Sequence, residues 1–161
     1  MGRMHDIRIA TIEILYAADV SDGDYKRTFE AYWGMSPAPV PVSKKLADQV
    51  EIFVDGILNH MEEIDTTIRS ASDNWDLTRI AKVDLGILRL AAYEVLFRRQ
   101  TPVRVIIDEA VEIAKEYSTS KSSAFVNGVL DRMGRESRKE EMKIKQEAKD
   151  NGRDNERTSK T

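Results

Sequence analysis

The chain has 161 residues, 41% of them hydrophobic and 33% charged, with a net charge of −3 and no cysteine. This length and apolar content predict one domain with a packed core, and the lack of cysteine excludes disulfides, thiolate metal sites and cysteine catalysis. No apolar run approaches the roughly 18 residues of a membrane span, and the N-terminus lacks a signal-peptide pattern, so we expect a cytoplasmic protein. Any nucleic-acid surface must be a local basic patch, because the net charge is acidic.

Helical periodicity dominates the first 70 residues. We predict a largely buried helix over 3–18, a short helix over 25–33, a helix capped by Ser43, and a shorter one carrying Ile64 and Ile68. Between the second and third of these, the three prolines of MSPAPVPV predict a connector, although a proline-rich recognition motif has the same composition. His60 has no second histidine nearby, which favours a surface or capping role.

The stretch 80–99, IAKVDLGILRLAAYEVLFRR, predicts a central helix of about five turns. Its apolar side chains cover most of the circumference, as expected for a helix surrounded by others. One small and basic stripe interrupts this surface, formed by Lys82, Gly86, Arg89 and Tyr93. Two interpretations remain open: a face kept for a partner, or a solvated stripe with a close helix contact at Gly86. Asp84 and Glu94 project from the apolar side.

Two further helices complete the predicted domain. Thr101 as N-cap and Pro102 at the first helical position begin one of them, with Tyr117 on its buried face. A polar loop over 118–123 precedes the last packed helix. Residues 136–161 carry charges of both signs and form a tail, which we predict to be helical up to about Lys149 and disordered after residue 152. No segment alternates with period two for long, so the fold class is all-α.

The sequence offers little for catalysis. It has no glycine-rich phosphate loop, no serine elbow, only two histidines and no Glu-x-x-His pair for a helical metal site. We therefore predict a binding module that is not an enzyme and holds no metal or cofactor. Basic residues near Tyr16 and Phe125 would suit single-stranded RNA, because phosphates take the charge and unstacked bases take the ring.

Several motifs together resemble the NusB family of transcription antitermination factors. They are ATIEILYAAD near the N-terminus and, in order, LRLAAYEVLF, PVRVIIDEAVEIAKEY and FVNGVLD, and the likeness spans about residues 3–135. The resemblance implies a helical domain over 1–135, with about seven helices in two small bundles. It also implies binding of boxA leader RNA together with NusE, a small-subunit ribosomal protein, to promote antitermination and ribosomal RNA synthesis. Other Nus factors and RNA polymerase would be indirect partners, and no membrane would be involved.

The resemblance also implies two sets of site residues. The RNA-binding positions are Arg3, His5, Arg8, Tyr16, Lys121, Ser122 and Phe125. The NusE-binding positions are Arg79, Lys82, Asp84 and Arg89, and for Asp84 we favour a partner contact over an ion pair at the core edge. The chain departs from the family at RMHDIR, where Asp6 interrupts a run that is arginine-rich in well-known members. Fewer phosphate contacts predict weaker RNA binding without the partner.

Two other functions remain open. The same helical domain precedes the catalytic domain of a ribosomal RNA cytosine methyltransferase. This chain lacks cysteines and a cofactor-binding α/β domain, which leaves a related non-catalytic module. The second alternative is an interaction or oligomerisation protein that never touches RNA. A monomer and a homodimer are both compatible with the resemblance.

Overall fold

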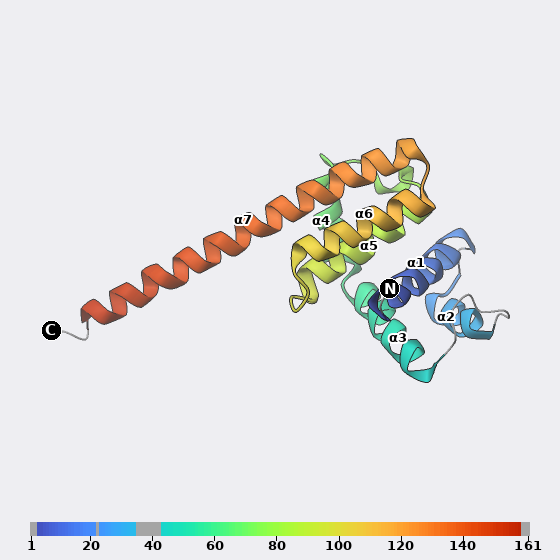
Figure 1. Ribbon diagram of the computed structural model, residues 1–161, viewed down its shortest axis with the longest axis horizontal. Coiled ribbons are helices and arrows are strands. Elements are labelled where there is room, and N and C mark those ends of the chain that lie inside the picture. The colour runs from blue at the N-terminus through green and yellow to red at the C-terminus, as the bar shows by residue number, and fades with distance from the viewer. Residues whose placement is uncertain (1–2, 22, 35–42, 159–161) are drawn as a thin grey trace.

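The computed structural model confirms the all-α prediction over the residues it describes, 3–21, 23–34 and 43–158 (Figure 1). No strand occurs among these residues, and the proline-rich connector lies outside them. Seven α-helices and one short 3₁₀ turn, η1, follow each other in the order α1 Arg3–Ser21, α2 Tyr25–Gly34, α3 Lys44–Asn59, α4 Met61–Ala71, η1 Leu77–Arg79, α5 Lys82–Phe97, α6 Val103–Tyr117 and α7 Ser120–Thr158.

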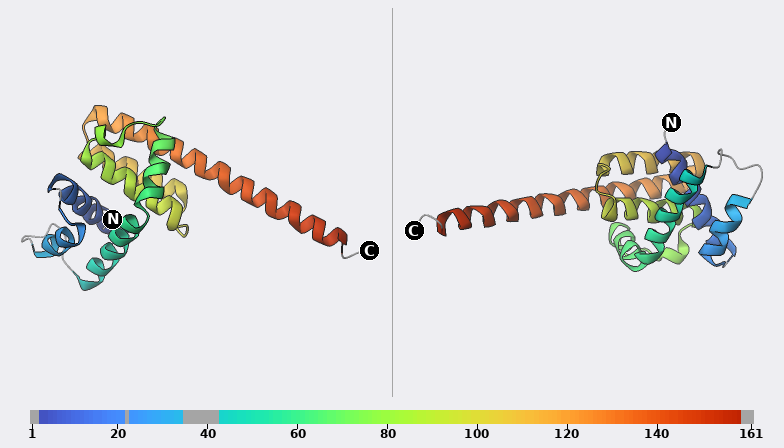
Figure 2. Two further views of the ribbon diagram at one scale, coloured as in Figure 1. Left: turned by 180° about the vertical axis from the view of Figure 1, so that it is seen from behind. Right: turned by 90° about the horizontal axis from the view of Figure 1, so that it is seen from below.

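The helices form two groups around one continuous core. Helices α1–α3 make one group and α4–α7 the other, and the three views in Figures 1 and 2 show α5 running through the junction. Helix α5 packs against α1, α3, α4, α6 and α7, which explains why its apolar side chains cover most of its circumference. The prediction of a central helix surrounded by others is confirmed.

Local capping explains where three helices begin. The Ser43 hydroxyl accepts the Leu46 N–H at 3.1 Å, as predicted for the N-cap of α3. Helix α6 begins one residue later than predicted, because Pro102 keeps extended backbone and acts as the N-cap. Helix α7 begins at Ser120, so the predicted loop over 118–123 is present only at Ser118 and Thr119 and is wrong over 120–123. The hydroxyl and carbonyl oxygens of Thr119 accept N–H groups of the first turn and start the helix early.

Helix α7 crosses position 136 without a break and leaves the bundle as a single helix (Figures 1 and 2). The predicted disorder after residue 152 is contradicted, because the helix continues through Asn151 and Gly152 to Thr158. A helix that is polar on all sides depends on pairs within itself. One such pair joins Gln146 and Asp150. The side-chain amide of Gln146 donates to the two carboxylate oxygens of Asp150, at 3.1 Å and 3.2 Å.

Gly56 of α3 leaves room for the Tyr93 side chain of α5. A Cβ at this position would overlap the Tyr93 ring, which is buried against Phe53 and Phe97. At Gly86 the nearest atom to a Cβ would be the Ile12 backbone carbonyl oxygen of α1 at 3.8 Å, an ordinary contact. The backbone of α1 therefore lies against Gly86, in agreement with the close helix contact that the sequence offered there.

A buried ion pair joins the two groups of helices. The Arg8 guanidinium of α1 donates from Nε and Nη2 to the two carboxylate oxygens of Glu94 in α5, both at 2.9 Å. Arg8 is only 5% exposed and Glu94 1%. Glu109 of α6 lies 3.9 Å from the same guanidinium and contacts Nδ1 of His5 at 2.6 Å. These four side chains connect α1, α5 and α6.

The two glycines form a matched pair of test sites. We expect Gly56→Ala to lower the free energy of unfolding by about 1–3 kcal/mol, because the added methyl group overlaps the enclosed Tyr93 ring. Gly86→Ala should be neutral or stabilise by up to about 1 kcal/mol, since alanine favours helix and the added methyl group makes only ordinary van der Waals contacts. Urea unfolding of both variants measures the difference, and equal stabilities would contradict the close approach at Gly56.

The ion pair should behave as a unit. Glu94→Ala leaves a buried guanidinium without its partner and should cost about 3–5 kcal/mol of stability. Replacing both members with apolar residues, Arg8→Met with Glu94→Leu, should recover most of that loss, because no charge is then buried unpaired. Thermal and urea unfolding of the single and double variants test this, and additive losses would show that the two side chains do not depend on each other.

Candidate functional site

The turn between α6 and α7 is held in place by a buried carboxylate. Asp84, in the first turn of α5, is 2% exposed and accepts a hydrogen bond from the Ser118 hydroxyl at the end of α6. A carboxylate near a helix N-terminus is also favoured by the helix dipole. The predicted contact between Asp84 and a protein partner is therefore not supported: this side chain faces the interior and positions the turn.

Two exposed aromatic rings lie on one side of this turn. Tyr16 near the end of α1 and Tyr117 at the end of α6 are 44% and 43% exposed, and they line a mostly apolar hollow of about 240 Å³ with Ile9, Ile12, Glu13 and Val83. Tyr117 had been expected on the buried face of its helix. Burial and the carboxylates of Glu116 and Glu13 raise the pKa of Tyr117, so its phenol stays neutral.

A second aromatic pair lies in the first turns of α7. Phe125 is partly buried and its ring centroid is 5.7 Å from that of Trp75, which is 50% exposed. Trp75 follows two residues with left-handed backbone, Asp73 and Asn74, and an exposed ion pair between Asp73 and Arg132 links this loop to α7. The loop that carries Trp75 therefore meets α7 at both Phe125 and Arg132.

The structure brings together only part of the predicted RNA set. Lys121 is exposed and Ser122 half-buried in the first turn of α7, one turn before Phe125 and four residues after Tyr117. These positions and Tyr16 surround the α6–α7 turn. Arg3 is exposed and His5 half-buried at the opposite end of α1, about 17–20 Å from Tyr16 at 1.5 Å per residue.

Arg8 is placed where it cannot make the phosphate contact predicted for it. Its guanidinium is buried and already forms two hydrogen bonds to Glu94. Burial encloses this guanidinium and Glu94 neutralises its charge, and extracting it toward a ligand would leave Glu94 unpaired. The basic residue at this position of α1 therefore has a structural role.

Two of the predicted partner residues line a second hollow. Lys82 and Arg89 line a space of about 460 Å³ between the end of α1, η1 and the start of α5. Arg79, an exposed residue of η1, does not line it, although its neighbours Thr78 and Ile80 do. Lys82 is exposed and its ammonium group donates to the Asp19 carbonyl. Asp84 does not line this hollow.

Arg89 forms the fixed floor of the second hollow. It donates to both carboxylate oxygens of Asp65, at 3.0 Å and 3.1 Å, and lies 3.4 Å from Asp19. Burial alone would lower the pKa of Arg89, but hydrogen bonding to Asp65 and the charge of Asp19 raise it overall. Burial and a hydrogen bond to Asp19 raise the pKa of Tyr25 to about 12. Arg89 is thus a charged, immobile group rather than a free cation.

Two candidate surfaces result: the aromatic residues around the α6–α7 turn, and the hollow that Lys82 and Arg89 line. Neither of them has the residues of a metal-dependent reaction. Within the described parts of the chain, no three or more histidine, aspartate or glutamate side chains are grouped so as to hold a metal ion. No helix in those parts is long and apolar enough to span a bilayer. What the surfaces do offer is exposed aromatic faces beside a lysine, and a separate polar hollow with a fixed positive floor.

The sequence analysis did not identify two aromatic residues near the α6–α7 turn, Trp75 and Tyr117. Trp75 is a large aromatic side chain within the polar segment SDNWD, where no helical periodicity requires it, and that isolation was a usable signal. Tyr117 follows the period of the buried face of α6, so periodicity alone assigns it to the core. It is exposed because it lies at the last residue of the helix, beyond the helices that cover that face.

Comparison with known proteins gives one consistent result. The family model described as the NusB family matches residues 5–135. The transcription antitermination protein NusB of Geobacter sulfurreducens is 41% identical over 131 residues, covering 81% of this chain and 93% of its own. That of Trichlorobacter lovleyi is 39% identical over 133 residues, covering 83% and 91%.

Solved structures agree with these relatives. T. maritima NusB superposes with a TM-score of 0.72 at 35% identity, covering 84% of this chain and 92% of its own. A crystal structure of antitermination factors NusB and NusE in complex with dsRNA has the same fold, with a TM-score of 0.68 at 24% identity, covering 84% and 98%. With its motifs, its helical order and its relatives in agreement, this chain belongs to the NusB family.

Proposed function

We propose that this chain is an antitermination factor that binds boxA-type leader RNA together with a NusE-like ribosomal protein in the cytoplasm. In this role it promotes antitermination and ribosomal RNA synthesis, with other Nus factors and RNA polymerase as indirect partners. The observation that carries the proposal is the family match over residues 5–135, together with two exposed aromatic pairs on either side of the α6–α7 turn.

The proposed RNA surface consists of Tyr16, Tyr117, Trp75, Phe125 and Lys121. Unstacked bases gain about 1–3 kcal/mol each by stacking on aromatic side chains, and a nearby lysine takes a phosphate. Both pairs are held by other contacts, because Asp84 holds the turn and Asp73 holds the Trp75 loop. A site that is ordered before binding loses less entropy when the RNA arrives.

The proposed partner surface is the hollow that Lys82 and Arg89 line. Residues 82 and 83 are neighbours in α5, and the first lines the partner hollow while the second lines the Tyr16 hollow. A protein bound in the partner hollow would therefore lie beside the RNA. This proximity supports joint binding and would compensate for the sparse basic residues at the start of α1.

A substitution of Trp75, in the loop between α4 and η1, gives the sharpest test of RNA binding. We expect Trp75→Ala to weaken binding of boxA RNA about tenfold or more, because one stacking surface is lost. Fluorescence anisotropy with boxA and scrambled RNA, with and without the ribosomal partner, measures this. Ile52→Ala removes a comparably exposed apolar side chain from α3 and is the control. No preference for boxA in the presence of the partner would refute the proposed function, and equal effects of the two substitutions would refute this surface.

The partner hollow is tested by reversing its exposed cation. Lys82→Glu should weaken binding of the ribosomal protein about tenfold while leaving the melting temperature nearly unchanged, since the side chain is at the surface. Lys115→Glu, a similar change at an exposed position of α6, should have no effect on this interaction. Isothermal titration calorimetry compares the two, and equal affinities would exclude this hollow as the docking surface.

A further inference from the structure

The part of α7 beyond the bundle is a feature that the family match does not cover. The match ends at residue 135, whereas the helix continues to Thr158. At 1.5 Å per residue this extension is about 35 Å long. It carries charges of both signs, and these charges are distributed unevenly around the helix.

Six of the seven basic residues of the extension share one face. At 100° per residue these six fall within about a third of the helix circumference, and Lys143 lies about 40° outside it. The face is formed by Arg138, Lys139, Lys145, Lys149, Arg153 and Arg157, and we call it the basic stripe. All six residues are exposed. Glu140, Glu147 and Asp154 recur every seven residues and follow a different ridge, whereas Asp150 falls at the edge of the stripe and position 156, a glutamate, falls within it, so the two signs are partly separated.

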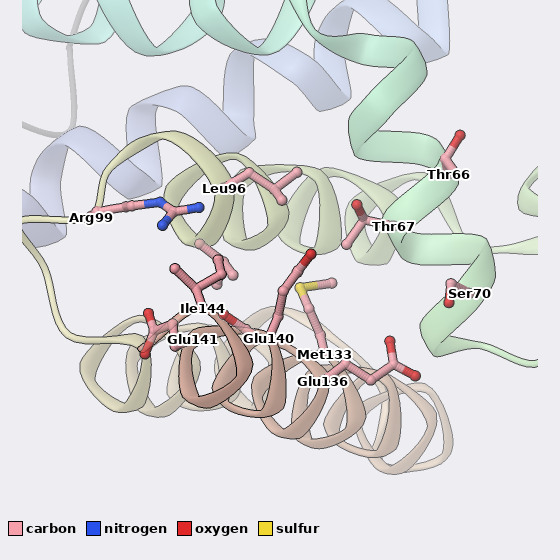
Figure 3. Close-up of a pocket in the computed structure, with 12 residues that line it drawn as sticks. Thr66, Thr67, Ser70, Leu96, Arg99, Met133, Glu136, Glu140, Glu141 and Ile144 are labelled. Carbon is pink, nitrogen blue, oxygen red and sulfur yellow. The ribbon is translucent and has the colours of Figure 1, made fainter. Parts of the chain in front are cut away.

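Contacts at the base of the extension orient the stripe. Met133 belongs to the core, and Ile144, three turns later on the same face, lines a hollow with Leu96 of α5 (Figure 3). The carboxylates of Glu140 and Glu141 also line this hollow, which Arg99 borders. The side of the extension that continues the core face is therefore acidic and apolar, and the basic stripe lies on the opposite side, away from the bundle.

The basic stripe continues the face of α7 that carries Lys121. Lys121 and Lys139 are 18 residues apart, which is about five complete turns, so they project in the same direction. One straight helix thus connects the proposed RNA surface at its first turn with a line of cations at its far end (Figure 1).

We propose that the basic stripe binds the phosphate backbone of the single-stranded RNA that flanks the boxA element. Binding of the phosphate groups along a nucleic-acid strand requires mainly a row of positively charged side chains. A protein partner would need a buried apolar or aromatic anchor, and Met142 is the only large apolar residue on this side of the extension. The inference rests on the proposed function, because boxA binding brings the flanking strand to α7.

The test compares two full-length variants by anisotropy. The first removes three stripe cations, Lys145→Gln, Lys149→Gln and Arg153→Gln. The matched control removes three carboxylates from other faces, Glu140→Gln, Glu141→Gln and Glu147→Gln. Glutamine favours helix, so circular dichroism should be unchanged in both. The probes are boxA RNA alone and boxA RNA with an unstructured uridine flank on either side, each with the ribosomal partner present.

We expect one of the flanked RNAs to bind the native chain about tenfold more tightly than boxA alone at low salt. The stripe variant should lose this advantage, and the slope of log affinity against log salt should fall by about 2, or about 0.7 for each lost contact. Binding of boxA alone should not change, and the control should keep the advantage. Equal binding of flanked and bare RNA by the native chain overturns the inference, as does weaker partner binding by the stripe variant in the absence of RNA. Loss of boxA preference in the native chain would instead refute the proposed function, because that comparison uses no flank.

Discussion

The ion pair between Arg8 and Glu94 is the constraint on which the arrangement of the two helix groups depends. Both side chains are almost completely buried, and each would be costly to bury alone. Helix α1 packs on α5 in the register that brings the guanidinium onto the carboxylate, and a shift that separated the two would leave both charges buried and unpaired. Glu109 and His5 extend the network to α6, so three helices from both groups are oriented together.

That register determines where both candidate surfaces lie. The last turns of α1 contribute Tyr16 to one hollow and Asp19 to the other, and the first turn of α5 contributes Val83 and Lys82 in the same way. The two surfaces are thus adjacent because they share the same two helices. The joint binding proposed for this chain would use this adjacency, which follows from how α1 crosses α5.

The C-terminal extension is stabilised in a different way from the helices of the bundle. It has almost no tertiary contacts beyond Ile144, so its helix depends on local propensity and on side-chain pairs such as that of Gln146 with Asp150. Free of packing demands, its sequence can place most of its basic residues on one side of the helix. The core helices cannot do this, because most of their surface is committed to burial.

The sequence by itself determined those features that depend on interactions between residues close together along the chain. Helical periodicity, capping residues and the motifs of residues 3–135 were sufficient for the fold class, the helix order and the family, because these follow from local spacing. The same reasoning placed Lys82 and Arg89 on one stripe, and they do line one hollow.

Tertiary structure alone decided the roles of the charged residues. Arg8 and Asp84 have the residue types of surface contacts, yet both are buried with partners far away in the sequence, Glu94 and Ser118. Trp75 likewise enters the proposed RNA surface only because its loop meets Phe125. Spacing along a chain shows which face a side chain occupies but not what faces it, since the partner comes from another helix. Whether a charge binds a ligand or holds the fold is therefore settled only when the helices pack.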